Sequence, residues 1–412
     1  MNRSLPKSIE TDSRQPGFFL SRRNWLQSLI AAGASGLLLT GTSRGEAPMA
    51  STSSLPKGLI IHTASPPNAE PPLDQLLQNW ITPVDRFYVR SHAPQNPEVD
   101  IAAWRLTVDG QVEKPLSLSL AELKEKFPTH EVTATLCCAG NRRDEMIRIK
   151  PIEGVPWQAG ALGNAKWGGV RLADVLKYAG LQGGGKHVWF EGLDRHDKKG
   201  ESIVFGGSIP VDRVMAGDPA GDVLIATTMN GQPLNSHHGA PARTLVPGFI
   251  GARSVKWLSK IHVADRPSYN HYVAHAYRLV YEETPAAWER ADIIYDLPLQ
   301  SVIVSAKDET NKQRTRLVVK GYAYSGGDAQ QKVARVEVSI NGGQSWTTAR
   351  ITSQVRPYCW QFWTAEIAHR KPVEQVLCRA IDASWRMQPE KTDWNPKGYM
   401  QHGWHSAKVT EG

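Results

Sequence analysis

The stretch with the clearest chemical potential is a pair of adjacent cysteines followed closely by two adjacent arginines, residues 135–143 (TLCCAGNRR). The β-branched, apolar residues 132–136 predict a short strand, so the cysteines stand at the start of a loop. Two cations in that loop lower the pKa of a thiol, and the resulting thiolate is a nucleophile or a ligand for a soft metal ion. Buried vicinal cysteines can equally be small hydrophobic core residues, so both interpretations stay open at this point.

The spacing of the cysteines argues against the common structural metal sites. The sequence has no CxxC pair, as zinc and iron–sulfur sites commonly use, and no CxxCH motif for a covalently attached haem. Cys359 and Cys378 both fall on predicted strands. An oxidising compartment would permit a disulfide between them, and the sequence leaves open whether one forms.

Three further segments are cationic, polar and rich in turn residues. They are residues 87–92 (FYVRSH), 229–243 (MNGQPLNSHHGAPAR) and 246–258 (VPGFIGARSVKWL). Each segment alone is compatible with a loop that carries solvated charges. The order and spacing of all three segments relative to the two cysteines indicate a family more specifically than any single segment does.

Together, these segments resemble the sulfite oxidase family of molybdenum enzymes over residues 73–409. Residues 138–143 resemble the family's molybdenum-ligand motif, which implies that the second cysteine, Cys138, supplies the thiolate. Residues 87–92 resemble a Phe-x-Val-Arg-x-His stretch whose arginine, here Arg90, faces both cofactor and substrate. The resemblance implies that the following residues contact the cofactor: Tyr88, Val89, Arg90, Ser91, His92, Asp194, His238, Arg243, Ser254, Val255 and Lys256.

The cofactor implied by this resemblance is one molybdenum bound to one pterin dithiolene. Its phosphate is anionic, so Arg243, Lys256 and His238 would supply charge-assisted hydrogen-bond donors. The implied reaction is the oxidation of sulfite to sulfate, with the redox chemistry carried by the cofactor. Four residues are implied to hold the sulfite oxygens or surround the anion: Arg90, Arg143, Tyr277 and Lys397.

Residues 394–398 (WNPKG) bear on the choice between sulfite and nitrate. Sulfite-oxidising members of the family carry Arg in a Trp-Asn-Leu-Arg-Gly stretch, whereas nitrate reductases carry Met there. Lys397 keeps the positive charge but loses the bidentate geometry of arginine. Because a sulfite dianion needs more cations around it than nitrate does, we expect sulfite. A nitrate reductase-like or sulfane-oxidising enzyme and a non-catalytic oxyanion-binding protein remain alternatives, as does a solvated surface role for Lys397.

The first fifty residues predict an export signal. Arg22 and Arg23 precede residues 28–40, an Ala-, Gly- and Leu-rich run that is too short to span a bilayer. Paired arginines in this position indicate the Tat route, which carries folded proteins, and therefore a periplasmic location. The formal net charge of +8 over 412 residues is dispersed, which is a weak argument for nucleic acid. We expect neither a nucleic-acid partner nor a membrane span.

Beyond the signal, the pattern predicts an extended linker over residues 51–72 and an α+β domain over residues 73–296, which the resemblance implies to be the molybdopterin-binding catalytic domain. Short strands at regular spacing over residues 297–412 predict an immunoglobulin-like β-sandwich. The resemblance implies that this sandwich mediates a homodimer. No haem motif occurs, so electrons must leave to an external acceptor, which we expect to be a c-type cytochrome.

Overall fold

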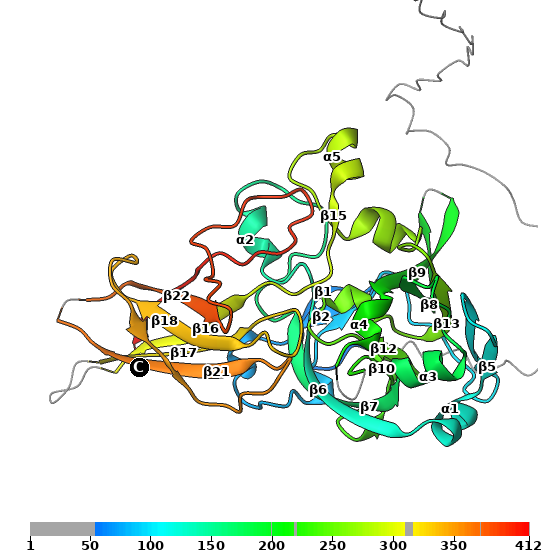
Figure 1. Cartoon of the computed structure of the whole chain (residues 1–412). Helices are drawn as coiled ribbons and strands as arrows, with labels where there is room; N and C mark the ends of the chain where they lie inside the picture. The colour runs from blue at the N-terminus through cyan, green and yellow to red at the C-terminus, as the bar shows by residue number, and fades with distance from the viewer. Residues whose placement is uncertain (1–53, 199, 218–220, 310–315, 371, 412) are drawn as a thin grey trace, which may run out of the picture. The chain divides into compact units, whose positions relative to one another are not determined.

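The computed structural model describes residues 54–198, 200–217, 221–309, 316–370 and 372–411 (Figure 1). The predicted export signal lies outside these residues. The described residues belong to one compact unit, in which sheets and short helices are followed by a sandwich of two sheets. Among them, no helix is both long and apolar enough to cross a membrane.

The first part of the chain is built on two main sheets, both largely antiparallel. One has the strand order β11-β10-β7-β6, with β12 also paired to β10. Its strands are β6 (Thr129–Cys137), β7 (Leu162–Arg171), β10 (Leu224–Met229), β11 (Gln232–Pro233) and β12 (Arg243–Leu245). The other has the order β5-β4-β13-β8-β9, in which β13 pairs parallel with β4. Its strands are β4 (Leu106–Gly110), β5 (Leu116–Leu118), β8 (His187–Lys198), β9 (Glu201–Pro210) and β13 (Leu258–Ala264).

Short helices and a two-stranded ribbon connect these strands. The α-helices are α1 (Leu120–Lys126), α2 (Arg143–Ile147), α3 (Leu172–Tyr178), α4 (Val211–Met215) and α5 (Pro285–Arg290). Single turns of 3₁₀ or π-helix are η1 (Leu73–Gln75), η2 (Val84–Arg86), η3 (Ser236–His238), η4 (Gly251–Arg253) and η5 (Tyr272–Ala276), and the ribbon pairs β14 (Arg278–Leu279) with β15 (Asp292–Ile293). A capping box starts α1, because Ser119 and Glu122 satisfy each other's backbone N–H groups.

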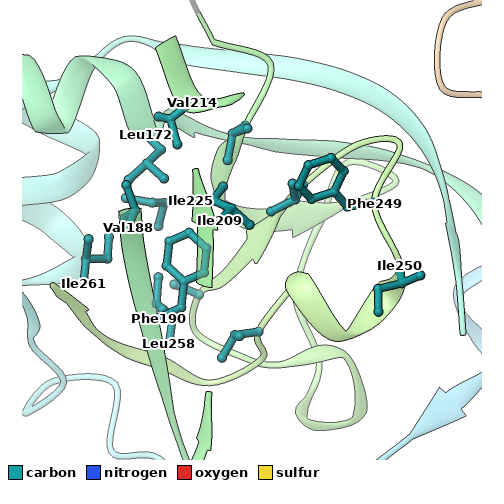
Figure 2. Packing of buried hydrophobic residues seen from close by; sticks show 14 of the residues in the cluster. Leu172, Val188, Phe190, Ile209, Val214, Ile225, Phe249, Ile250, Leu258 and Ile261 are labelled. Atoms are coloured by element: carbon teal, nitrogen blue, oxygen red, sulfur yellow. The ribbon is translucent and has the colours of Figure 1, made fainter. Parts of the chain in front are cut away.

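The largest hydrophobic core joins both main sheets to the helices. Leu172 of α3, Val188 and Phe190 of β8, Ile225 of β10 and Ile261 of β13 are all at most 1% exposed. Figure 2 shows these side chains gathered between the strands. The same cluster continues into the sandwich through Val302, Tyr322, Tyr324 and Trp360. The two parts of the chain therefore share a core rather than meeting through a flexible linker.

The sandwich confirms the predicted immunoglobulin-like architecture. One sheet has the order β20-β21-β17-β16-β24 and the other β19-β18-β22-β23, with a separate apolar core between them. The strands are β16 (Gln300–Asp308), β17 (Arg316–Tyr324), β18 (Val333–Ser339), β19 (Thr347–Thr348), β20 (Arg350–Ile351), β21 (Gln361–Ala368), β22 (Gln375–Asp382), β23 (His405–Lys408) and β24 (Thr410–Glu411). Cys359 and Cys378 are both buried free thiols, which answers the open question of a bridge between them.

The segment predicted as a linker is structured. Its residues form β1 (Ile60–Thr63) and β2 (Asn68–Glu70), and β2 pairs with β3 (Val89–Arg90) in the order β1-β2-β3. Three of the four residues of Ile60–Thr63 are β-branched, which favours a strand and outweighs the Ser and Pro residues that suggested an extended tether. The consequence is local and important, because β3 carries Arg90.

Candidate active site

A cavity opens beside the end of β6, where the two adjacent cysteines lie. It encloses roughly 640 Å³, including the part that is open to solvent. Most of the predicted cofactor residues line it: Tyr88, Arg90, Ser91, His92, Cys138, Asp194, His238, Arg243, Ser254 and Lys256, together with Tyr277. Val89 and Val255 are buried, at 1% and 0% exposure, and are not among the lining residues.

The two cysteines have different surroundings. Cys138 lines the cavity, and its sulfur accepts a hydrogen bond from the backbone N–H of Gly140 at 3.5 Å. Cys137 lies on the opposite side, with its sulfur 3.2 Å from Tyr324 Oη of the sandwich. Burial raises the pKa of the Cys137 thiol well above its ordinary value, so this thiol stays protonated. The geometry thus supports Cys138, and not Cys137, as the cysteine that could ligate a metal.

Arg90 is held by neutral partners. Its Nη1 donates to Asn68 Oδ1 at 3.0 Å and also to the carbonyl oxygen of Ser91, and its Nη2 lies 2.7 Å from His92 Nε2. A guanidinium always donates, so His92 Nε2 accepts and carries no proton. Burial, followed by the charge of Arg90, lowers the pKa of His92 well below its usual value, which keeps the ring neutral. The positive charge of Arg90 is therefore oriented without being cancelled.

Tyr277 brings a hydroxyl to the same place. Its Oη lies 3.1 Å from His92 Nε2, at the end of the π-helical turn η5. Burial raises the pKa of Tyr277, so the hydroxyl remains protonated and can donate. The structure thus places Arg90, His92 and Tyr277, which are predicted from two distant segments, in one hydrogen-bonded group.

A second group of cations lies along the same cavity. Arg243 donates to the carbonyl oxygens of His238 at 3.1 Å and Ser254 at 2.9 Å, and Lys256 Nζ donates to Ser91 Oγ at 3.0 Å. Burial lowers the pKa of Arg243 to about 10 and that of Lys256 well below its ordinary value. The lowered pKa values reflect the free-energy cost of keeping two positive charges away from water in a site with too few negative charges.

His238 is neutral in this setting. Burial, then the charges of Arg243 and Lys256, lower its pKa to about 3. Its Nε2 lies 3.2 Å from the carbonyl oxygen of Val84, to which it donates. The predicted contribution of a histidine cation is therefore replaced by that of a neutral hydrogen-bonding ring.

Asp194 is the carboxylate among the lining residues. It is 4% exposed, and its Oδ1 has no hydrogen-bond partner among the described residues. Burial raises its pKa to about 6, against the opposing charge of Lys256. A buried acceptor without a donor is costly to leave unmet, so this oxygen points to a ligand that brings an N–H or O–H group.

Arg143 and Lys397 are not among the cavity-lining residues. Arg143 Nε donates to the backbone oxygen of Lys397 at 2.9 Å and its Nη1 to that of Val155 at 2.7 Å. The Lys397 ammonium lies 5.2 Å from the ring centroid of Trp288. Both were predicted to surround the anion directly. Here Arg143 instead ties the loop after Cys138 to the C-terminal segment, and the charge of Lys397 lies over an aromatic ring.

Two residues of this neighbourhood were missed by sequence reasoning. Asn68 is 1% exposed and orients Arg90, and its signal was hidden in the segment taken for a linker. Tyr399 stacks on Tyr277, with ring centroids 5.3 Å apart. Tyr399 lies two residues after Lys397, directly after the motif of residues 394–398, which is the signal that could have indicated it.

The residues present fit a phosphorylated molybdenum–pterin group. Arg243 is a buried cation and Lys256 a partly buried one, and both need an anion; Asp194 offers an unmet acceptor, and Cys138 offers a soft ligand. The donor set therefore matches a polyanion that also carries hydrogen-bond donors and a thiophilic metal.

Comparisons with known proteins agree with this arrangement. Residues 92–272 match the oxidoreductase molybdopterin binding domain, and residues 291–412 match the Mo-co oxidoreductase dimerisation domain. The chain is 41% identical over 365 residues to a protein named sulfite oxidase from Gallus gallus, covering 84% of this chain and 77% of that protein. The chain belongs to the sulfite oxidase family of molybdopterin oxidoreductases.

Two further proteins are similar to this chain over most of its length. Sulfite oxidase from Arabidopsis thaliana is 35% identical over 381 residues, covering 86% of this chain and 94% of that protein. The crystal structure of the sulfane dehydrogenase SoxCD from Paracoccus pantotrophus superposes with a TM-score of 0.70 at 29% identity, covering 88% of this chain and 92% of that one. The chain spans only 65% of the length of the mammalian mitochondrial sulfite oxidases that it matches. It is thus a sulfite oxidase-type molybdenum oxidoreductase.

Proposed function

We propose that this oxidoreductase converts sulfite to sulfate and passes the electrons to a separate acceptor, a c-type cytochrome. The observation that carries the proposal is the cavity that brings the Cys138 thiol together with the Arg90–His92–Tyr277 group. When bound, the molybdenum–pterin group supplies the two-electron redox chemistry. Cys138 would hold its metal, and Arg243 and Lys256 would hold its anionic end.

The chain's own residues define how the substrate is handled. Arg90 presents a partly buried positive charge that its neutral partners do not cancel, and this charge attracts an oxyanion. The single hydroxyl proton of Tyr277 can point either to the unprotonated Nε2 of His92 or to a substrate oxygen, so a bound oxyanion can take the place of His92 as its acceptor. These contacts orient the anion and stabilise the charge that shifts during the reaction.

The test is metal analysis of the purified protein combined with reduction of cytochrome c. We expect about one molybdenum per chain and sulfite-dependent reduction of the cytochrome. Nitrate with a viologen donor is the parallel assay, and activity on nitrate without activity on sulfite would overturn the proposal. Protein that binds sulfite without containing molybdenum would instead be the non-catalytic alternative.

Oxidation of a sulfane sulfur is the second candidate function. It is favoured by the fold similarity to the sulfane dehydrogenase SoxCD. A persulfide substrate carries less negative charge than sulfite, so it would depend less on the charge of Arg90. Turnover of a persulfide at a higher kcat/KM than sulfite would select this alternative.

We further propose that the protein is exported to the periplasm by the Tat route and works as a homodimer. The support is the twin-arginine pattern at Arg22 and Arg23 and the match of residues 291–412 to a dimerisation domain. Replacing both arginines with lysine should leave cofactor-loaded protein in the cytoplasm. Unchanged export in a strain without the Tat translocase would refute the route, and a monomeric mass by light scattering would refute the dimer.

A further inference from the structure

We propose that Asn68 is a positioning residue, which sets the orientation of Arg90 and keeps its charge available to the substrate. This inference rests on the proposed function of the cavity as an oxyanion site. Asn68 is the first residue of β2, lies directly opposite Arg90 in the pairing with β3, and is 1% exposed. Arg90 lines the cavity, whereas Asn68 is not among its lining residues.

The amide of Asn68 is fixed by hydrogen bonds on both of its ends. Its Nδ2 donates to Thr63 Oγ1 at 2.8 Å and to the carbonyl oxygen of Pro66 at 3.0 Å. The Thr63 hydroxyl itself donates to that same carbonyl, so it can only accept from Asn68. The nitrogen of the amide is thereby assigned to this side. Its oxygen must face the other way, toward β3.

On that other side, Oδ1 accepts from two donors, one on Arg90 of β3 and one on Ser91, which follows β3. It lies 3.0 Å from Arg90 Nη1 and 3.1 Å from the backbone nitrogen of Ser91. Asn68 therefore fastens both the side chain of Arg90 and the backbone that follows it. The turn between β1 and β2 fixes the amide, and the amide fixes the guanidinium.

The donors of Arg90 can be counted. A guanidinium has five N–H groups, and Arg90 gives one each to Asn68 Oδ1, the Ser91 carbonyl and His92 Nε2. The others have no hydrogen-bond partner within the described part of the chain and remain available to an anion in the cavity that Arg90 lines. None of the three partners carries a negative charge. An aspartate at position 68 would have almost the same shape but would form an ion pair and cancel the charge.

Asn68→Asp is therefore the decisive variant, because it changes charge with little change in volume. We expect KM for sulfite to rise about 10- to 100-fold, with a much smaller change in kcat and with molybdenum content retained. Asn68→Ala should raise KM about tenfold, because Arg90 loses its orientation but keeps its charge.

Asn164 provides the matched control. It is also fully buried, at 0% exposure, and its amide is also held on both ends, by Thr135 Oγ1 and by the carbonyl oxygen of Trp80. Asn164→Asp and Asn164→Ala should lower the melting temperature at least as much as the Asn68 variants while leaving the sulfite KM within about twofold. Equal KM changes at the two positions would show that Asn68 acts only through stability.

A second measurement separates this inference from the proposed function. In the cofactor-free protein with ¹³C-labelled histidine, the His92 resonance, assigned with a His92→Gln variant, reports on the guanidinium beside it. We expect the apparent pKa of His92 to rise in Asn68→Ala, because the charge of Arg90 that lowers it moves away. An unchanged His92 titration overturns the positioning role. If molybdenum-loaded wild-type protein fails to oxidise sulfite, the proposed function fails, while this titration still decides the role of Asn68.

Discussion

The ring of Tyr277 stacks on the ring of Tyr399 with centroids 5.3 Å apart and planes inclined by 18°. Guanidinium groups close the stack on both outer faces. Arg253 lies 5.8 Å from the centroid of Tyr277, and Arg143 lies 5.2 Å from that of Tyr399. Such cation–π contacts contribute about 0.5–2 kcal/mol each, depending on desolvation. The stack therefore fixes the ring that presents a hydroxyl to the cavity.

Removing the second ring of this stack should impair substrate binding without removing a cavity-lining residue. For Tyr399→Leu we expect sulfite kcat/KM to fall about tenfold, because the Tyr277 hydroxyl loses its fixed distance to His92. Tyr399→Phe keeps the ring and should retain most activity. Steady-state kinetics on both variants checks this, and equal losses in the two would show that the Tyr399 hydroxyl matters and the stacking does not.

The two neighbouring cysteines should behave oppositely when each is changed to serine. Cys138→Ser should lower sulfite oxidation by about 100-fold or more, because an alkoxide is a poor substitute for a soft thiolate ligand. Cys137→Ser should retain substantial activity, because that thiol faces Tyr324 and remains protonated. Sulfite assays normalised to molybdenum content provide the measurement. The reverse order of effects would contradict our assignment of the ligand.

The contacts of Lys397 in the structure predict a smaller effect of its substitution on sulfite binding than the motif alone did. Its ammonium lies over Trp288, and its contact with Arg143 is made by the backbone oxygen, which every side chain retains. We therefore expect Lys397→Met to raise the sulfite KM by several-fold at most, and Lys397→Arg to change it less. Arg90→Met should raise it far more, by about 10- to 100-fold, because it removes a charge that lines the cavity. Equal effects at the two positions would show that Lys397 reaches the anion.

The raised pKa of Asp194 predicts a pH-dependent stability of the cofactor-free protein. The folded carboxyl has a pKa of about 6, above the ordinary value of 3.8. Between these values the folded state binds the proton more tightly than the unfolded state, so stability is higher at low pH and falls as the pH rises from about 4 to 6. The loss amounts to at most about 2–3 kcal/mol.

Urea unfolding at several pH values would measure this effect. Asp194→Asn should flatten the fall in unfolding free energy between about pH 4 and pH 6, while the fall persists in the wild-type protein. Lys256 is the charged group that opposes the shift, so Lys256→Met should move the fall to higher pH. Wild-type and Asp194→Asn proteins with parallel pH profiles would refute the assignment.

The order of elements was predictable where local patterns decide the structure. The capping box at Ser119, the strand before Cys137 and the sandwich strands all follow from spacing and residue type. Residues 346–351 show where such patterns fail. They form one short run, yet β19 pairs with β18 in one sheet and β20 with β21 in the other. A strand that changes sheets looks the same in sequence as one that does not.

The candidate site also has features that local sequence patterns predicted and features that depend on contacts between distant segments. The cationic lining was predictable, because its residues occur in compact motifs whose side chains face one cavity. The roles of Arg143, Asn68 and Tyr399 were not, because each depends on a contact between distant segments. The neutral state of His238 also required the fold, since only burial beside Arg243 and Lys256 lowers its pKa.

The residues that support Arg90 and Tyr277 lie far apart along the chain, and this affects when the site can form during synthesis. Arg90 is oriented by a residue near the start of the described chain, whereas Tyr277 is braced by Tyr399 near its end. A nascent chain in which Tyr399 has not yet left the ribosome would therefore lack the second ring of the stack. A frameshift that removes Tyr399 should therefore weaken turnover even though every cavity-lining residue has already been translated.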